Sequence, residues 1–344
     1  MGIQKKIAIL SGVSQTTVSF VLSGKGTFPE STRTKILQAA KALKYKRRHS
    51  PEKTKKAARK KGRPTLGLFW QNTLFEPFKD SFFQKIFEGI MFSCIANQLD
   101  ISIKSIESDS NVDRQLKSFD AAIIMHTNGT YNLACQSRGT PLVTVFGDPR
   151  DGSNTMASVN INNQAATRIA FEHLYAMGHR RIGYMSPSLT GHSVMDRWEG
   201  MEECFLRYGL VPDPAWTTHH HYNGYFLSGK INLNRIWQAE VKPTAIVAYN
   251  DMTALGMLEE ARSLGIRVPE DLSIVSLDNI YESETSSPPL TTVDFDLKEI
   301  GARAVVLAHD LFRNPRTTPH VVLEPRLIPR QSVCRIHQHD LQYA

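Results

Sequence analysis

The spacing of apolar positions divides this chain of 344 residues into two parts. Residues 4–22 carry apolar groups at helical spacing, interrupted at Gly12, which predicts two short helices joined by a tight turn. Ser14, just after the turn, is a natural N-cap for the second helix. A third helix is expected to begin near Pro29. The pattern predicts a small three-helix domain of the helix-turn-helix type, whose second helix is suited to the major groove of DNA.

Each predicted helix places small or apolar residues on one side, so three helices are expected to close a small core. The residues expected on these inner faces are Ile7, Ala8, Leu10, Ser11, Val18, Val21, Leu22, Ile36, Leu37, Ala40 and Leu43.

From Thr65 onward, short apolar runs alternate with longer segments at helical spacing. The expected strands are Leu66–Trp70, Ala121–Met125, Leu142–Phe146, Ile182–Met185, Ala245–Ala248 and Ser273–Leu277. The expected helices are Phe82–Ile95, Gln164–Met177, Met195–Tyr208, Met252–Ser263 and Leu297–Leu311. Strands that alternate with helices predict an α/β fold with parallel sheets. This part is too long for one tidy sheet, so two similar lobes are expected.

The composition is that of a folded protein, with 41% hydrophobic and 22% charged residues. No apolar run is long enough to span a membrane, and the N-terminus does not fit a secretory signal. The cysteines lie far apart without a CxxC motif, which predicts neither a disulfide framework nor a zinc knuckle. We expect a cytoplasmic protein without membrane partners. The four cysteines are Cys94, Cys135, Cys204 and Cys334.

Positive charge is concentrated at the N-terminus. Residues 1–64 hold 17 Lys and Arg but only two acids, whereas the remaining residues hold 24 Lys and Arg and 31 acids. Residues 1–64, the head of the chain, are strongly basic, and the remaining residues, its body, are mildly acidic. This distribution indicates that the head binds a polyanion. A solvated basic tail without a partner is the alternative.

A motif in the head resembles a known family. Residues 8–24 read Ala-x-Leu-Ser-Gly-Val-Ser-x-x-Thr-Val-Ser-x-Val-Leu-x-Gly, followed by Thr32-Arg33 and Lys44-Tyr45. This resembles the headpiece of the lactose-repressor/galactose-repressor family of transcriptional regulators. The resemblance implies that Gln15 and Thr16 read base edges, and a Gln amide suits adenine. The family usually carries Arg where this chain has Phe20, which is expected either to touch a thymine methyl group or to pack in the headpiece.

The resemblance also implies contacts with the DNA backbone, which fix register without reading sequence. For Thr17 and Ser19 the alternative is a solvent-facing helix position. The side chains expected at phosphates are Ser14, Thr17, Ser19 and Tyr45 in the headpiece and Lys53, Lys56 and Arg59 beyond it.

Residues 46–63 form a basic linker with ten Lys or Arg and one acid, Glu52. In the family a hinge helix here inserts a leucine into the minor groove, but this chain has no Leu between Leu43 and Leu66. An apolar wedge is therefore absent. We expect a basic arm that becomes ordered along the phosphates, with a flexible spacer as the alternative.

The resemblance continues through the body. Blocks that match the family include Gly178-His179-Arg180-Arg181-Ile182-Gly183-Tyr184, Asn250-Asp251-x-x-Ala254-x-Gly256 and Val268-Pro269-Glu270-Asp271. The resemblance implies a periplasmic-binding-protein-like core, in which a ligand binds between two lobes and the chain crosses between them near residues 160, 290 and 322. The expected parts are a headpiece (1–46), a linker (47–64) and a core (65–340). Lobe 1 would hold about 65–160 and 291–322, and lobe 2 about 161–290 and 323–340.

Ligand-binding residues follow from the same resemblance. An Arg fork can bridge two hydroxyls, and an amide with a carboxylate can hold sugar hydroxyls. An internal salt bridge is the alternative for Arg197 and Asp278, and core packing is the alternative for Phe83. Either Tyr222 or Tyr225 would stack on a sugar face. The residues expected at the ligand are Phe83, Asp148, Ser193, Arg197, Tyr222, Asn250 and Asp278.

No motif supports catalysis, since the chain lacks a GxSxG elbow, a Walker loop and an HExxH sequence. His219-His220-His221 is not expected to bind a metal, because neighbouring residues of a strand point to opposite faces. We therefore expect no enzyme, cofactor or metal. The prediction is a homodimeric repressor that binds a pseudo-palindromic operator and a small ligand, with a carbohydrate as the expected class. The alternative is a sugar sensor that binds DNA only nonspecifically.

Overall fold

The computed structural model describes residues 3–23, 28–43, 45, 63–71, 80–106, 114–125, 139–147, 156–220, 222–314 and 318–336. The chain divides into two compact units, residues 1–62 and residues 63–344. Within the described residues the first unit is helical, and the second contains two six-stranded sheets.

The first unit is the predicted helix-turn-helix domain. Its helices are α1 (Ile3–Ser11), α2 (Gln15–Ser23) and α3 (Glu30–Ala42). Gly12 ends the first helix with a φ of +68°, a conformation that glycine adopts without a steric penalty. The Ser14 side chain accepts a hydrogen bond from the Thr17 amide at 3.1 Å, which confirms it as the N-cap of α2.

Two residues expected in the headpiece core are exposed. Leu10 is 61% exposed and Leu37 is 49% exposed, so these two predictions are wrong. The inward position next to Leu10 is taken by Ser11, whose hydroxyl donates to the Ile7 carbonyl at 2.6 Å. Ala8, Ala39 and Ala40 supply small side chains to the same interior. The fully or nearly fully buried core is Ile7, Ala8, Val18, Ile36, Ala39 and Ala40.

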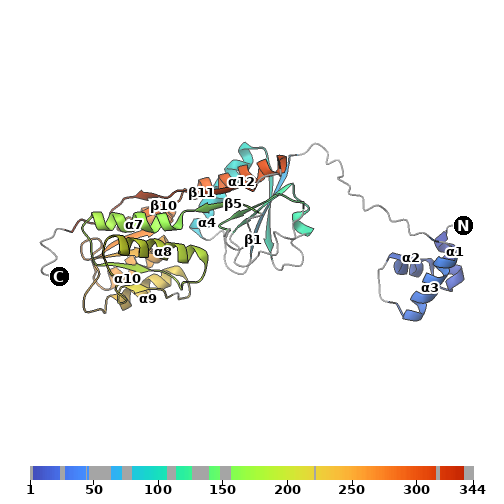
Figure 1. The fold of residues 1–344 in the computed structure, drawn as a ribbon, viewed down its shortest axis with the longest axis horizontal. Coiled ribbons are helices and arrows are strands. Elements are labelled where there is room, and N and C mark those ends of the chain that lie inside the picture. Colours follow the sequence, from blue (N-terminus) through green and yellow to red (C-terminus); the bar gives the residue numbers. More distant parts are fainter. Residues whose placement is uncertain are drawn as a thin grey trace. The chain divides into compact units, whose positions relative to one another are not determined.

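The second unit holds two lobes, each built on one sheet (Figure 1). The first sheet is parallel throughout, in the order β11-β5-β4-β3-β1-β2. Its strands are β1 (Thr65–Gln71), β2 (Asp100–Ile106), β3 (Ala121–Met125), β4 (Leu142–Val145), β5 (Ala157–Ile161) and β11 (His320–Leu323).

The second sheet has the order β12-β10-β9-β8-β6-β7, and only its β10–β12 pair is antiparallel. Its strands are β6 (Ile182–Met185), β7 (Thr217–Thr218), β8 (Ala245–Ala248), β9 (Ser273–Leu277), β10 (Thr291–Asp294) and β12 (Arg326–Ile328). The predicted α/β fold with two parallel sheets is thus confirmed.

The helices cover the sheets in pairs. In the first lobe α4 packs against α12, and in the second lobe α7 packs against α8 and α9 against α10 (Figure 1). The helices are α4 (Ser81–Ala96), α7 (Asn163–Ala176), α8 (His192–Arg207), α9 (Tyr225–Ile236), α10 (Asp251–Ser263), α11 (Tyr281–Thr285) and α12 (Leu297–Arg313).

The chain passes between the two sheets at three places. It leaves the first sheet after β5, returns between β10 and α12, and crosses again between β11 and β12. Because β10 pairs with β9, the second crossing lies after Asp294. A lobe connected by three adjacent segments can change its angle to the other lobe without unfolding.

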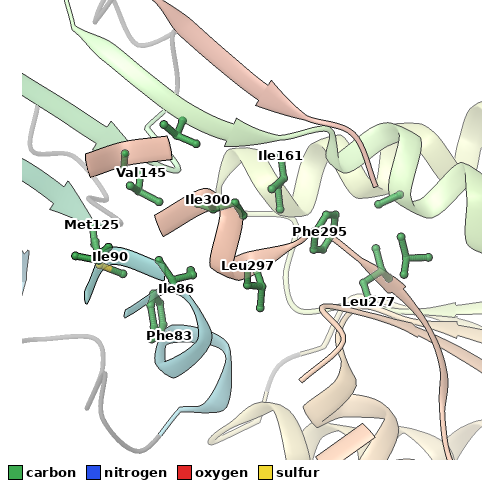
Figure 2. Packing of buried hydrophobic residues seen from close by; sticks show 14 of the residues in the cluster. Phe83, Ile86, Ile90, Met125, Val145, Ile161, Leu277, Phe295, Leu297 and Ile300 are labelled. Carbon is green, nitrogen blue, oxygen red and sulfur yellow. The ribbon is translucent and has the colours of Figure 1, made fainter. Parts of the chain in front are cut away.

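Alternate residues of the central strands serve different cores, as the pleat of a strand requires. Val247 and Val275 face the layer of α7 and α8, whereas Ile246 and Ile274 face α9 and α10. The larger core extends from the first lobe into the second, from Ile86 on α4 to Phe295 at the crossing (Figure 2).

Helices α4 and α12 approach each other very closely. A Cβ atom at Gly89 would overlap the Lys298 carbonyl, and a Cβ atom at Gly301 would overlap the Ile86 carbonyl. Both glycines therefore permit the contact that holds these helices on the first sheet. Among the described helices, none combines the length and the apolar character needed to cross a membrane.

Candidate DNA-binding and ligand-binding sites

Helix α2 separates its residues into a core face and an exposed face. Val18 is fully buried, and Val21 and Leu22 are half-buried against the headpiece core. The exposed side carries Gln15, Thr16, Ser19 and Phe20. Gln15, Thr16 and Phe20, the three residues predicted to read bases, therefore share one solvent-facing surface.

The headpiece residues predicted at phosphates have different surroundings. Ser14 and Thr17 bond to each other, with 2.8 Å between their side-chain oxygens, at the N-terminus of α2. The first N–H groups of a helix attract anions, so these two hydroxyls stand where a phosphate is favoured. Tyr45 is half-buried against the core, and its amide donates to the Ala40 carbonyl at 2.8 Å.

Some predicted site residues lie outside the described residues. These are Lys53, Lys56 and Arg59 of the linker and Asp148 of the first lobe.

Polar and aromatic residues gather where the strands of the second sheet end. Tyr249 and Asn250 follow β8, and Asp278 follows β9. In open α/β sheets, ligands bind outside the carboxyl ends of the strands. The sheet thus brings these side chains to the edge at which a ligand is expected.

Arg197 of α8 reaches into this group and is only 4% exposed. Its Nε donates to the Asn163 Oδ1 at 2.8 Å, and one terminal nitrogen donates to the Tyr249 carbonyl at 2.5 Å. The other terminal nitrogen lies 3.4 Å from the Asp278 carboxylate. The internal salt bridge considered from the sequence is therefore present, and the guanidinium is held rigidly in place.

One tyrosine ring packs on the guanidinium, and a second stacks on the first. The Arg197 Cζ lies 4.4 Å from the centre of the Tyr249 ring, which stacks on Tyr225 at 5.8 Å. The Tyr249 hydroxyl lies 3.3 Å from the Ser193 hydroxyl. Burial raises the pKa of the Tyr225 hydroxyl, so this phenol stays neutral and can donate a hydrogen bond. Of the two tyrosines considered for stacking, Tyr225 is the one in this aromatic group.

Carboxyl groups face this group from both lobes. Burial raises the pKa of the Asp278 carboxyl well above its usual range, Arg197 opposes this rise, and the charge of Asp80 adds to it. Asp80 belongs to the first lobe, where its side chain caps α4 by accepting from the Phe82 amide at 2.9 Å. Burial also raises the pKa of Asp80. The arrangement can accept hydrogen bonds from a ligand's hydroxyl groups.

Asn250 is engaged with its own helix. Its Oδ1 accepts from the Thr253 amide at 2.9 Å and from the Thr253 hydroxyl at 2.7 Å, which caps α10. Next to it, the fully buried Asp251 accepts from the Thr292 hydroxyl at 2.6 Å and from the Ile280 amide at 2.8 Å. These bonds connect the starts of α10 and α11 to β10 and hold this part of the site in place.

Phe83 and Tyr222 differ in their surroundings from the aromatic group. Phe83 is 7% exposed and belongs to the large core, where its ring meets Phe82 edge to face at 5.2 Å. This burial favours the packing role over a ligand contact. Tyr222 is half-buried, and its amide donates to the Ser228 hydroxyl at 2.8 Å.

A set of contacts joins α4 of the first lobe to α11 of the second. The Tyr281 hydroxyl donates to Glu88 at 2.7 Å, and the Ser81 hydroxyl donates to Glu282 at 2.5 Å. The Lys85 ammonium donates to the Asn279 carbonyl and lies 4.6 Å from the centre of the Tyr281 ring. These contacts hold one particular angle between the lobes.

Two family models match the chain. The model described as bacterial regulatory proteins of the lacI family matches residues 5–48, and a periplasmic binding protein-like domain matches residues 171–333. The HTH-type transcriptional repressor PurR of Pasteurella multocida is 28% identical over 342 residues, which is 96% of this chain and 98% of that protein. The chain belongs to the lacI family of bacterial regulatory proteins.

Other members of the lacI family are similar over the same extent. The ribose operon repressor of Haemophilus influenzae is 25% identical over 97% of this chain and 99% of its own length. A lac repressor dimer bound to operator and the anti-inducer ONPF has a TM-score of 0.68 at 21% identity, covering 95% and 98% of the two chains. A complex of the transcriptional regulator CelR with cellobiose has a TM-score of 0.67 at 23% identity, covering 96% and 99%.

Three residues of the site in this lacI-family chain, Asp80, Tyr249 and Asn163, were not predicted from the sequence. A signal for Asp80 was present, because an Asp directly before an apolar helix is a common N-cap. Tyr249 follows a predicted strand, which is a position where ligand residues of α/β folds gather. Asn163 acts on Arg197 from the first turn of α7, a contact that only the fold reveals.

No cluster of three or more His, Cys, Asp or Glu that could hold a metal ion occurs among the described residues. His219 lies 2.8 Å from the Ser186 hydroxyl, and its ring meets Trp198 edge to face at 4.7 Å. Burial lowers the pKa of His219, so its ring is neutral near pH 7.

Proposed function

We propose that this chain is a transcriptional repressor that binds a pseudo-palindromic operator as a homodimer and is controlled by a small carbohydrate. The observation that carries the proposal is the presence, on one chain, of an exposed recognition helix and a two-lobed body with a rigidly held arginine between aromatic rings. The first feature suits sequence reading, and the second suits ligand binding.

The control would work by linkage. A ligand that contacts both lobes favours one angle between them, and a change in that angle alters the spacing of two headpieces in a dimer. The charge of Asp80 in the first lobe acts on the carboxyl group of Asp278 in the second, which supports a ligand that touches both lobes.

In the ligand site, Arg197 and Asp278 would hold hydroxyl groups, with Ser193, Asn250 and Asp148 as further polar contacts. Tyr225 would supply the aromatic face for a sugar ring, in preference to Tyr222, and Phe83 would support α4 from the core. A carbohydrate is the proposed class because stacked tyrosines beside charged hydrogen-bonding groups suit a sugar's apolar face and hydroxyl rim. The relatives of this chain include a regulator in complex with cellobiose and a ribose operon repressor.

On DNA, Gln15, Thr16 and Phe20 would contact base edges in the major groove. Ser14, Thr17, Ser19 and Tyr45 would contact phosphates near the headpiece. Lys53, Lys56 and Arg59 would contact the backbone from the linker, where each phosphate contact adds about 0.9 to the salt dependence of the affinity.

Self-association is proposed through α4. Phe92 and Ile95 lie on the surface of this helix, where they are 68% and 69% exposed. Large apolar side chains exposed side by side mark a surface suited to a protein partner. A second copy of the chain is the proposed partner, since two headpieces are needed to read a two-fold symmetric site.

The test is a selection from random duplex DNA with the full-length chain, followed by sedimentation of the complex. Enrichment of a two-fold symmetric sequence bound by two chains supports the proposal. Binding with a steep salt dependence but without an enriched sequence would contradict the proposal. It would favour the alternative, a sugar sensor that binds DNA nonspecifically through its basic linker. Gln15→Ala is the matched control, because it removes a base contact while leaving the linker intact.

A further inference from the structure

The exposed face of α2 contains one large apolar side chain. Phe20 is 45% exposed, and the described headpiece core is built from other residues. A ring that is partly in water loses part of the free energy that full burial would contribute. Of the two roles expected for Phe20, packing in the headpiece core therefore does not describe this position.

The helical geometry places Phe20 on the surface that faces DNA. Residues four apart lie on the same side of a helix, and Phe20 follows Thr16 by four positions. Val18 and Val21 point to the opposite side, where they meet the core. Phe20 thus lies next to Thr16 at the edge of the surface that begins with Gln15.

The chemistry of the major groove limits what a phenyl ring can recognise there. Adenine, guanine and cytosine present hydrogen-bond donors and acceptors, which a phenyl ring cannot satisfy, whereas thymine adds a C5-methyl group. Placing the ring against a purine N7 or O6 would remove that acceptor from water without a partner, which is unfavourable. The thymine methyl group is the contact that the ring can make with a gain in free energy.

We infer that Phe20 selects a T·A base pair in each operator half-site by packing on the thymine methyl group. The inference rests on the proposed function, since it specifies how that DNA surface reads sequence. The helix rises 1.5 Å per residue, so Gln15 and Phe20 are about 7.5 Å apart along its axis, or about two base-pair steps. The selected thymine therefore lies within about three base pairs of the adenine paired to Gln15.

The experiment uses the full-length chain and the duplex obtained by selection. Each thymine of the half-site is replaced in turn by deoxyuridine, which lacks only the methyl group. The expected result is about fourfold weaker binding at one position in each half-site and little change elsewhere, as the loss of one buried methyl group predicts. At that position, a 5-methylcytosine·guanine pair is expected to bind more tightly than a cytosine·guanine pair.

Variants of Phe20 test whether this residue carries the effect. Phe20→Ala is expected to bind thymine and deoxyuridine duplexes equally, whereas Phe20→Leu, which keeps an apolar contact, retains part of the difference. Phe20→Arg is expected to move the preference at the same position to guanine, which an Arg fork recognises.

Two outcomes would count against the inference in different ways. Specific binding that is indifferent to deoxyuridine at every thymine would overturn the role of Phe20 and leave the proposed repressor intact. A methyl effect that persists unchanged in both Phe20→Ala and Phe20→Leu would assign it to another residue. Failure to enrich any sequence would instead remove the proposed function itself.

Discussion

A terminal nitrogen of the Arg197 guanidinium lies 3.4 Å from the carboxylate of Asp278, and both side chains are almost completely buried. The pair is completed by bonds from Arg197 to Asn163 and to the Tyr249 carbonyl. Removing charges from water is costly, so a buried pair of this kind depends on each partner being present. The arginine proposed to hold the ligand is also a structural element of the second lobe.

Replacement of Arg197 tests this dual role. Arg197→Met leaves Asp278 buried without its partner, and we expect the free energy of unfolding at pH 7 to fall by about 3 to 5 kcal/mol. Arg197→Lys keeps a charge and should lose less. The double variant Arg197→Met/Asp278→Asn should recover part of the loss in urea unfolding. A change below about 1 kcal/mol in Arg197→Met would show that the pair contributes little.

The contact between Tyr281 and Glu88 spans the two lobes. Because both side chains are partly exposed, Tyr281→Phe should change the free energy of unfolding by less than about 1 kcal/mol. It should nevertheless alter the affinity for the ligand severalfold, since it releases one angle between the lobes. The measurement is calorimetric titration with the sugar that the chain binds.

Tyr208→Phe is the matched control for this variant. Its hydroxyl lies 3.2 Å from Glu172 within the second lobe, so its loss does not affect the contact between lobes. Equal effects of Tyr281→Phe and Tyr208→Phe on ligand affinity would contradict the role assigned to the contact between α4 and α11.

The close approach of α4 and α12 predicts strong effects of added methyl groups. A Cβ atom at Gly89 or Gly301 would meet backbone carbonyls, which cannot move aside as a flexible side chain can. We expect Gly89→Ala and Gly301→Ala to lower the free energy of unfolding by about 2 kcal/mol or more, despite the better helix propensity of Ala. Glu202→Ala on the exposed side of α8 is the control and should be nearly neutral in the same urea unfolding measurement.

The buried His179 should make the free energy of unfolding depend on pH. It is 1% exposed, bonded to Thr244 at 3.0 Å and to the Cys334 carbonyl at 3.1 Å, and burial lowers its pKa to about 4. The unfolded chain takes up this proton at a higher pH than the folded chain does. Above pH 6.5 the neutral His179 therefore contributes about 3 kcal/mol to the free energy of unfolding. This contribution is lost as the pH falls toward 4.

The measurement for His179 is the free energy of unfolding between pH 4 and pH 8. His179→Asn removes the titrating group, so its stability should fall less steeply below pH 6.5 than that of the unsubstituted chain. Identical slopes for the two proteins would show that His179 does not titrate with a lowered pKa.

Much of the fold followed from the apolar pattern alone. Strands Ala121–Met125, Ile182–Met185, Ala245–Ala248 and Ser273–Leu277 have the same bounds in the structure as in the prediction. They are buried on both faces of a parallel sheet and therefore read as continuous apolar runs.

Some helices and strands were not predicted from the apolar pattern, for physical reasons. Helix α9 packs against α10 and buries Ser228, Gly229 and Asn232 beside Leu233 and Ile236, so only the last part of its inner face is apolar. Strand β2 lies at the edge of its sheet and alternates polar with apolar residues. Strand β7 has two residues, too few to carry a periodic signal.

The candidate ligand site was predicted less completely than the fold. The family resemblance, and not the apolar pattern, indicated Asn250, Asp278 and Arg197. The sequence does not reveal which of these groups bond to each other, because Asn163 and Arg197 come from different helices. Whether a polar residue contacts a ligand or a neighbouring side chain depends on tertiary geometry, which periodicity does not encode.

Coupling between ligand and operator is what the proposed repressor requires, and it can be measured from both sides. Operator affinity is measured by titration with and without each of a panel of monosaccharides and disaccharides at fixed salt. The affinity of the active sugar is then measured with and without operator. Both affinities are expected to change by the same factor, between about 5 and 150, because coupling between two binding sites is reciprocal. Specific operator binding that no sugar alters, together with sugar binding that operator leaves unchanged, would contradict the proposed coupling.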